Sequence, residues 1–254
     1  MADQTTDPEA RDAQWETVES ADGPMRVYVA RPDAPAAADR AVLVLQEAFG
    51  VNDHIQQVAR RIAARGFLAL APDLFHRTGV STLDYAQHAE AMPLIGAIGA
   101  EQIDTDVTAA LGHLAAAHGV PVERTALVGF CFGGRAAFTA ATRIAHLAGA
   151  VAFYGPGIAA GPHAVLDRAA DLDAPILLHV GSEDPTIPAD QVAAIDEALG
   201  KAGVDYRSHL YPDAGHAFAC DARPNMYRPG PARQAWERTW DFLEEHLPGT
   251  TPGT

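Results

Sequence analysis

Residues 129–134, with the sequence GFCFGG, constrain the fold of this chain more than any other stretch. They follow the apolar run 125–128, whose length and composition are typical of a buried strand. They precede residues 135–145, which are rich in Ala and free of Gly and Pro, and this composition favours a helix. The stretch therefore predicts a strand, a sharp turn of the form G-x-C-x-G, and a helix.

A turn of this form lifts its central residue out of the sheet. In α/β-hydrolases that residue is a nucleophile, usually Ser, and here it is Cys131. Gly129 and Gly133 carry no side chains that would clash as the chain folds back on itself. The free N–H groups at the start of the following helix favour a negative charge on the sulfur. A buried, inert Cys in a Gly-rich turn fits the six residues about equally well, so the rest of the chain has to decide.

Strands and helices are predicted to alternate from residue 41 onward, after two strands at 15–20 and 25–30. The other expected strands are 41–46, 67–71, 125–128, 148–154, 176–180 and 205–211. A helix is expected from Asp53, with Gln56 completing a capping box, to Gly66; the others are 83–92, 101–118, 135–145, 162–170, 188–201 and 231–247. This alternation predicts an α/β fold with a mostly parallel central sheet and helices on both faces. We expect one domain over residues 14–247, between a disordered tail at 1–13 and a flexible tail at 248–254.

Three polar residues follow predicted strands in the order nucleophile, acid, base: Cys131, Asp184 and His216. The loops after parallel strands meet at one edge of a sheet, so these side chains are expected to converge there. A thiol is mostly protonated at pH 7, because its free pKa is about 8.5. His216 can take that proton, and Asp184 can hold the imidazole in the required tautomer.

Each of these assignments has an alternative in the sequence. Asp190 competes with Asp184 for the role of the acid, and His179 and His209 compete with His216 for that of the base. The two rival histidines lie within predicted strands, where a structural role is more common. The order and the loop positions together favour Cys131, Asp184 and His216.

Charge and composition exclude several classes of function. The formal net charge of −15, with no basic block, argues against a nucleic-acid partner. Residues 1–13 are unlike a signal peptide, and no apolar run approaches the length of a membrane span. Two cysteines do not make a disulfide framework, which favours a reducing cytoplasm. No H-x-x-x-H or C-x-x-C pair is present, so no metal is expected.

Beyond these patterns, the chain resembles the dienelactone hydrolases, a branch of the α/β-hydrolases with a Cys nucleophile. The resemblance extends from Val42 to Leu247 and includes a Q-E-x-F-G loop ahead of the Cys turn. Its motifs are QEAFGVN at 46–52, PDLF at 72–75, GFCFGG at 129–134, FYG at 153–155 and AGHAF at 214–218.

The resemblance implies a catalytic triad of Cys131, His216 and Asp184. It implies that Glu47 contacts the resting thiol and helps to deprotonate it once substrate binds. The backbone N–H groups of Phe132 and Ala48 would form the oxyanion hole. No cofactor is implied.

The resemblance also bears on substrate binding. Members that act on dienelactone hold the substrate carboxylate with two arginines, and Arg77 matches the first. The second would lie four residues after His216, where this chain has Cys220. The clamp is then at most half present, and we expect a preference for neutral substrates. Tyr154 is a further candidate for the pocket wall.

The sequence thus predicts an enzyme that cleaves a small ester or lactone through an acyl-thioester on Cys131. Two alternatives remain. In one, Cys131 and Cys220 serve a thiol-based redox or sensing function; in the other, the chain is a catalytically silent binding module. The sequence does not indicate the oligomeric state.

Overall fold

The computed structural model describes residues 12–33 and 39–249, and its centre is an eight-stranded sheet. The tails expected at 1–13 and 248–254 lie mostly outside these ranges, and the first strand already begins at Ala13. The strands are β1 (Ala13–Ser20), β2 (Gly23–Ala30), β3 (Ala41–Leu45), β4 (Leu68–Pro72), β5 (Thr125–Phe130), β6 (Gly149–Phe153), β7 (Ile176–Gly181) and β8 (Tyr206–Tyr211).

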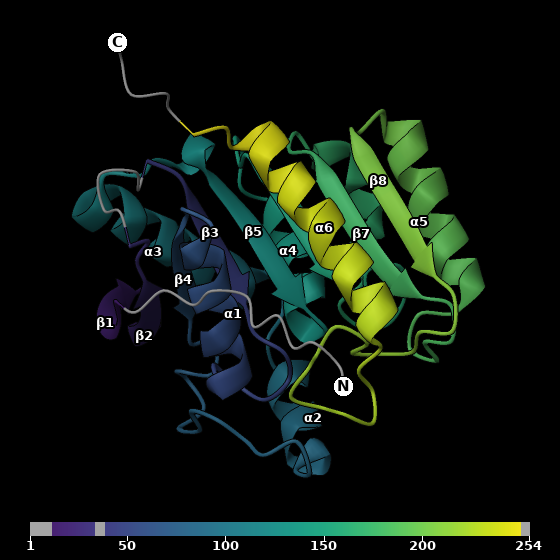
Figure 1. Ribbon diagram of the computed structural model, residues 1–254, viewed down its shortest axis with the longest axis horizontal. Coiled ribbons are helices and arrows are strands. Elements are labelled where there is room, and N and C mark those ends of the chain that lie inside the picture. Colours follow the sequence, from purple (N-terminus) through teal and green to yellow (C-terminus); the bar gives the residue numbers. More distant parts are fainter. Residues whose placement is uncertain (1–11, 34–38, 250–254) are drawn as a thin grey trace, which may run out of the picture.

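The strand order across the sheet is β1-β2-β4-β3-β5-β6-β7-β8. The β1–β2 and β2–β4 pairs are antiparallel and all other pairs are parallel, so the expected mostly parallel sheet is confirmed. Every residue of β3, β4, β5, β6 and β7 is buried, as their continuous apolar sequences require. In Figure 1 the arrowheads of the parallel strands lie at the lower end of the sheet.

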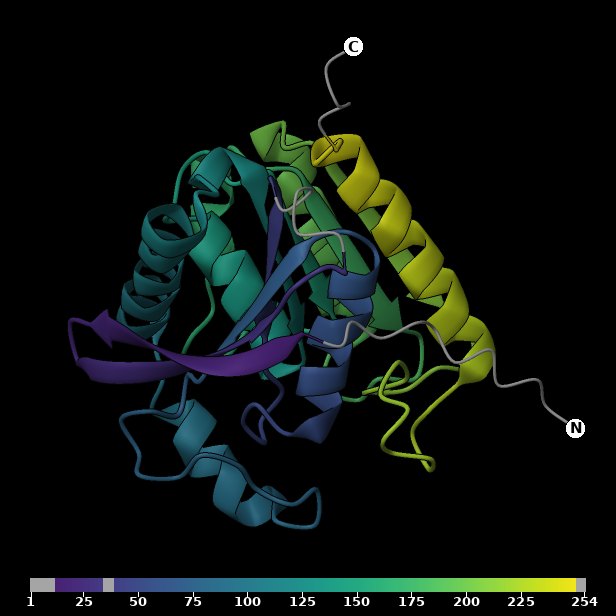
Figure 2. The same cartoon turned by 60° about the vertical axis from the view of Figure 1, so that its left-hand side comes forward.

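Helices cover both faces of the sheet (Figures 1 and 2). The helices α1 (Asp53–Ala64) and α6 (Pro229–His246) pack with Val42 and Val44 of β3 in one apolar core. The helices α3 (Ala100–His118), α4 (Phe132–Ala141) and α5 (Ala189–Ala202) pack with Leu43 and Leu45 in the other. Alternate residues of one strand thus enter opposite cores, because side chains of a strand point to alternate faces.

Helix boundaries differ from the sequence prediction at several places. The cap of α1 is Asn52, whose side chain accepts a hydrogen bond from the Ile55 N–H at 3.2 Å, and not Asp53. The helix expected at 83–92 is α2 (His88–Gly96), because the side chains of Asp84 and Gln87 stabilise a turn ahead of it. The described residues also contain two short 3₁₀ segments, Val122–Arg124 and Leu166–Asp171, the second in place of the weak helix expected at 162–170.

Candidate active site

Cys131 occupies a strained turn between β5 and α4. Its backbone φ of 54° is in the left-handed region, which residues other than Gly rarely adopt. A Cβ atom at Gly129 would lie 1.9 Å from the Gly133 carbonyl oxygen, and one at Gly133 would lie 2.1 Å from that of Leu45. The turn therefore requires Gly at both positions, because the main chain itself fills the space.

The structure brings Cys131, His216 and Asp184 together in one hydrogen-bonded row. His216 Nε2 lies 3.1 Å from Cys131 Sγ, and its Nδ1 lies 2.8 Å from Asp184 Oδ2. The Asp184 side chain is fully buried, whereas the His216 side chain is 14% exposed and Cys131 is partly exposed. The thiol can thus reach a substrate from solvent while its hydrogen-bond partners remain shielded.

Main-chain contacts hold the acid and base loops against each other. The Glu183 N–H donates to the Ala214 carbonyl at 2.9 Å. A Cβ atom at Gly181 would lie 2.2 Å from the same oxygen, so only Gly permits this approach. The loops after β7 and β8 are therefore fixed relative to one another, which sets the distance between Asp184 and His216.

Thr186 is a further member of the row. Its hydroxyl donates to Asp184 Oδ1 at 2.6 Å and lies 3.2 Å from His216 Nδ1, and its N–H donates to Asp184 Oδ1 at 2.8 Å. These bonds leave Oδ2 of Asp184 for the imidazole. Thr186 was not among the predicted site residues, although its position two residues after Asp184 suits such a turn.

The charges in this row stabilise one another. Burial acts to lower the pKa of His216, but its hydrogen bonds to Asp184 and Cys131 outweigh burial and raise the pKa to about 10. Burial acts to raise the pKa of Asp184, but the bonds from His216 and Thr186 lower it overall. The site thus favours an imidazolium between two potential anions, the arrangement that a reactive thiolate needs.

The two N–H groups expected to bind an oxyanion belong to Phe132, which follows the nucleophile in the sequence, and to Ala48, in the loop after β3. Phe132 is the first residue of α4, where no earlier carbonyl of the helix can accept its N–H. Ala48 follows β3, and within the described residues its N–H makes no backbone hydrogen bond in turns, loops or caps. Both groups are therefore available to a ligand.

Glu47 lies in a buried polar cluster beside this turn. It is 1% exposed, and its Oε2 accepts a hydrogen bond from the thiol of Cys220 at 3.7 Å, while Oε1 has no partner. Cys220 is fully buried and also contacts the hydroxyl of Tyr85 at 3.5 Å. The expected contact of Glu47 with the Cys131 thiol is thus replaced here by one with Cys220.

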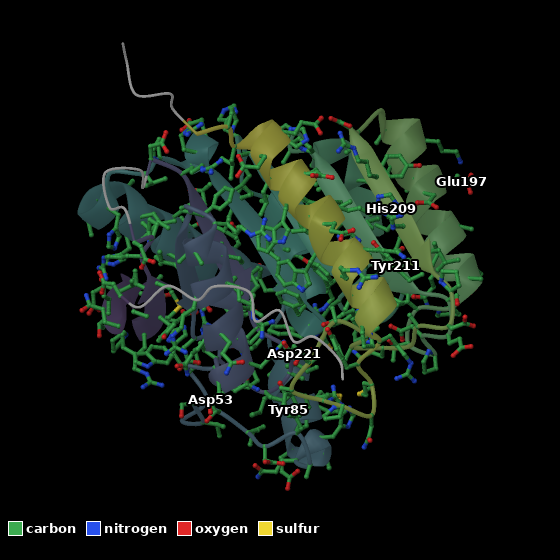
Figure 3. All side chains as sticks on the ribbon, viewed as in Figure 1. Asp53, Tyr85, Glu197, His209, Tyr211 and Asp221 are labelled. Carbon is green, nitrogen blue, oxygen red and sulfur yellow. The ribbon has the colours of Figure 1, made fainter. Side chains whose placement is uncertain are left out.

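His54 and Asp221 extend the cluster, and the sequence analysis missed both. His54 Nδ1 lies 3.0 Å from Asp221 Oδ1, and Arg61 donates to Asp221 Oδ2 at 2.5 Å. Burial acts to lower the pKa of His54, but Asp221, Cys220 and Glu47 raise it to about 10. Figure 3 shows Asp221 and Tyr85 at the end of the sheet where the parallel strands point.

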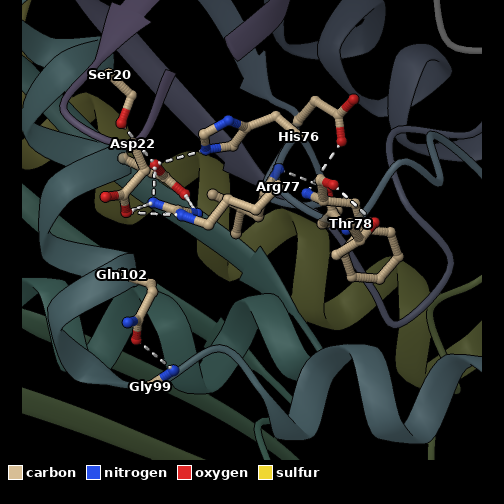
Figure 4. Close-up of polar contacts among 12 residues, drawn as sticks. Ser20, Asp22, His76, Arg77, Thr78, Gly99 and Gln102 are labelled. Carbon is tan, nitrogen blue, oxygen red and sulfur yellow. Dashed lines mark hydrogen bonds and ion pairs between the residues drawn. The ribbon is translucent and has the colours of Figure 1, made fainter. Parts of the chain in front are cut away.

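Within the part of the chain that the structure describes, the polar contacts of Arg77 lie outside this cluster. Its guanidinium donates two hydrogen bonds to the buried Asp106, at 2.6 and 2.7 Å, and a third to Asp22 at 2.7 Å (Figure 4). Asp106 also accepts from Ser20 and contacts His76. These partners join the β1–β2 turn to α3, so Arg77 has a structural use that accounts for its contacts.

Tyr154 packs against His216, the proposed base among the three residues. Its ring lies edge-on to His216, with centroids 5.3 Å apart, and its φ is 38°. Burial raises its pKa, so the phenol stays neutral.

The alternative acid and bases lie outside the row. His179, in β7, forms hydrogen bonds with Thr239 and Tyr211 in the core, and the ring of His209, in β8, stacks on that of His179. Asp190 is exposed in the first turn of α5.

Comparison with known proteins identifies the family. The sequence model that describes the dienelactone hydrolase family matches residues 25–247 of this chain. The chain belongs to the dienelactone hydrolase family. A protein of Yersinia pestis named as a carboxymethylenebutenolidase is 37% identical over 237 residues, which cover 91% of this chain and 87% of that protein.

Other members agree with this assignment. A Bradyrhizobium protein named as a 2-oxo-3-(5-oxofuran-2-ylidene)propanoate lactonase is 33% identical over 227 residues, covering 87% of this chain and 90% of the relative. A crystal structure titled as a dienelactone hydrolase of Klebsiella pneumoniae has a TM-score of 0.83 and 32% identity, and covers 92% of this chain and 98% of that one. The expectation of an α/β-hydrolase fold is confirmed.

The comparisons also confirm the expected enzyme class, a dienelactone hydrolase-like hydrolase of esters or lactones. They do not favour a redox sensor or a silent binding module. Within the described residues no helix is both long and apolar enough to cross a membrane.

Proposed function

We propose that this dienelactone hydrolase family member cleaves a small ester or lactone through an acyl-thioester on Cys131. One observation carries the proposal: the thiol, imidazole and carboxylate of Cys131, His216 and Asp184 form a continuous row at the carboxyl ends of the strands. Ligands of open α/β sheets bind at this edge. Both cysteines are free thiols, which suits the reducing cytoplasm expected from the sequence.

In the first half-reaction the sulfur of Cys131 attacks the carbonyl carbon, and His216 holds the proton released by the thiol. The N–H groups of Phe132 and Ala48 stabilise the negative oxygen of the tetrahedral intermediate. As the intermediate collapses, the carbon–oxygen bond breaks and His216 protonates the departing alkoxide. With a lactone substrate, this alcohol remains attached to the acyl group.

In the second half-reaction a water molecule attacks the thioester carbonyl. His216 accepts a proton from the water, and the same two N–H groups bind the oxyanion. Collapse releases the carboxylic acid and returns the proton to the sulfur. Asp184 keeps the Nδ1 proton of His216 in place throughout, so that Nε2 faces the reacting atoms.

Substituting the acid tests the orientation of the base. Asp184→Asn is expected to lower kcat by about four orders of magnitude, because an amide that donates to Nδ1 stabilises the wrong imidazole tautomer. Steady-state hydrolysis of a p-nitrophenyl ester measures the effect. Asp190→Asn, an exposed acid six residues away, is the matched control and should retain full activity. Equal losses in both variants would contradict the assignment of Asp184.

Glu47 is proposed to help ionise the thiol when substrate enters. The carbonyls of Leu45 and Gln46 touch the Gly133 position, so the Glu47 loop adjoins the nucleophile turn. Glu47→Gln is expected to slow acylation by about a hundredfold, a usual effect for loss of a general base. Thermal stability should stay unchanged or rise, because an unpartnered carboxylate oxygen is buried there.

Pre-steady-state bursts of p-nitrophenol measure the acylation rate separately from later steps. A large fall in melting temperature with an unchanged burst would instead make Glu47 a structural residue.

The relatives' names indicate lactones as the substrate class, and both names describe molecules with a carboxylate or propanoate group. This chain has Cys220 at the position where the resemblance implies the second arginine, and Arg77 is occupied by Asp106 and Asp22. We therefore expect kcat/KM to be higher for a neutral lactone than for its carboxylate analogue. Cys220→Arg should shift this ratio toward the carboxylate substrate by about tenfold or more, the usual effect of one charge-assisted hydrogen bond.

A matched set of p-nitrophenyl esters and lactones, with and without a carboxylate, tests both the activity and this preference. Intact-mass detection of a hydroxylamine-sensitive acyl group on Cys131 tests the thioester. Oxidation of Cys131 without any ester turnover would support the redox alternative and refute the proposed hydrolysis.

A further inference from the structure

Three buried side chains beside the active site bring together atoms that commonly bind metals. Glu47, His54 and Cys220, here called the Glu47 cluster, each offer one ligand atom, and these atoms lie within 4.8 Å of one another. Their residues are 1%, 3% and 0% exposed. They come from the loop after β3, the first turn of α1 and the loop before α6, so the tertiary fold alone assembles them.

Two atoms of the cluster lack hydrogen-bond partners within the described structure. Glu47 Oε1 and His54 Nε2 are both buried without one. Most buried polar atoms in proteins are hydrogen bonded, and leaving one unpaired costs about 1–3 kcal/mol. A cation bound by the cluster would draw a ligand atom from each of these two side chains.

Asp221 orients the imidazole for such a role. Its carboxylate lies 3.0 Å from His54 Nδ1, which keeps a proton on that nitrogen, so Nε2 is the nitrogen that can bind an ion once its own proton has left. Histidines that bind metals almost always have this carboxylate or carbonyl partner on the other nitrogen. Arg61 in turn pairs with Asp221 and fixes its position.

The spacing and the ligand types suit zinc. Thiolate and carboxylate atoms at about 2.3 and 2.0 Å from Zn²⁺ in tetrahedral geometry are about 3.5 Å apart. Cys220 Sγ and Glu47 Oε2 are 3.7 Å apart. A set of one sulfur, one nitrogen and one oxygen favours a borderline-soft ion over Mg²⁺ or Ca²⁺, which prefer oxygen alone.

The charges also balance. The carboxylate of Glu47 and the thiolate of Cys220 carry two negative charges, which a divalent ion neutralises. Asp221 is already neutralised by Arg61. The occupied site would be electrically neutral, which is the condition for burying ions at low cost.

We propose that Glu47, His54 and Cys220 form a binding site for a divalent transition-metal ion of the zinc class, distinct from the row of Cys131, His216 and Asp184. The proton of the Cys220 thiol and any proton on His54 Nε2 leave as the ion binds. Three protein ligands leave a fourth tetrahedral position open. This proposal does not depend on ester hydrolysis. A bound ion would hold the Glu47 carboxylate, so the role proposed for Glu47 at the Cys131 thiol belongs to the metal-free protein.

A second group, Glu16, His113 and His118, is a weaker candidate and serves as a control. Its residues are only partly buried, and Glu16 already bonds both histidines and Arg31. It contains no sulfur, so a metal bound there gives a different optical spectrum.

The test uses Co²⁺ as a spectroscopic probe on tag-free protein that carries Cys131→Ser and His113→Gln. Only Cys220 can then form a cobalt–thiolate bond, because the chain has two cysteines and the other is replaced. We expect one equivalent of Co²⁺ to bind with a near-ultraviolet thiolate-to-cobalt band, and Zn²⁺ to displace it. Absence of this band, or binding without it, would overturn the proposal.

Further substitutions in that background identify the ligands. Cys220→Ser should abolish the band, and His54→Gln should weaken binding at least tenfold. Asp221→Asn, which removes only the orienting carboxylate, should weaken it by about 10–100-fold. His209→Gln, in β8, should leave the affinity unchanged. Circular dichroism verifies folding, and Glu47→Gln is a second ligand variant if one fails to fold. Unchanged affinity in the folded His54 and Glu47 variants would refute the site.

Discussion

Cys131→Ala is expected to lower kcat/KM for a p-nitrophenyl ester by about four to six orders of magnitude. Loss of a nucleophile removes the covalent route, and the oxyanion N–H groups account for only the small residual rate. The fold should remain intact, because the turn depends on Gly129 and Gly133 and not on the thiol. Steady-state kinetics and a melting curve on the same preparation measure the two effects separately.

Two further measurements test whether the second thiol, that of Cys220, attacks the substrate in place of Cys131. Cys131→Ser puts a hydroxyl in place of the thiol, and its kcat/KM should be intermediate between those of the wild type and Cys131→Ala. Near-normal turnover in Cys131→Ala would show that another group attacks the substrate, and intact-mass analysis of that variant would show whether Cys220 carries the acyl group. That result would end the proposed mechanism.

Gly133→Ala is expected to destabilise the protein by about 3 kcal/mol or more, since the added Cβ meets backbone atoms that cannot rotate away. The Cβ would lie 2.1 Å from the Leu45 carbonyl oxygen and 2.5 Å from that of Gln46. For a chain of this length the melting temperature should fall by about 6–12 °C.

Gly112→Ala provides the matched control within α3. A Cβ there meets nothing within 4 Å. Because Ala restricts the unfolded chain more than Gly, this variant should be more stable by about 0.5–1 kcal/mol. Equal melting temperatures for Gly133→Ala and wild type would mean that the turn has another shape.

The sequence predicted the fold well where local patterns determine it. The apolar run before Cys131 and the Gly residues around it define β5 and the turn without reference to distant residues. The loops containing Asp184 and His216 were recognisable because each follows a predicted strand, and a parallel sheet brings such loops to one edge.

Contacts between distant segments could not be predicted in this way. Nothing in the residues around Arg77 indicates that Asp106, on a later helix, accepts its hydrogen bonds. Likewise His54 and Asp221 are 167 positions apart, and each alone is an ordinary polar residue. The expectation of no metal rested on short motifs, which cannot detect a group such as the one proposed at 47, 54 and 220, in which Cys220 lies far from the other two residues in the sequence.

The unequal burial of the two thiols gives the protein a built-in reporter of its own conformational openings. Cys131 is partly exposed and Cys220 is fully buried. An alkylating reagent should therefore label Cys131 in the native state, but reach Cys220 only when the loop before α6 detaches or the chain unfolds. The ratio of doubly to singly labelled molecules over time thus measures how often that loop opens, without any added probe.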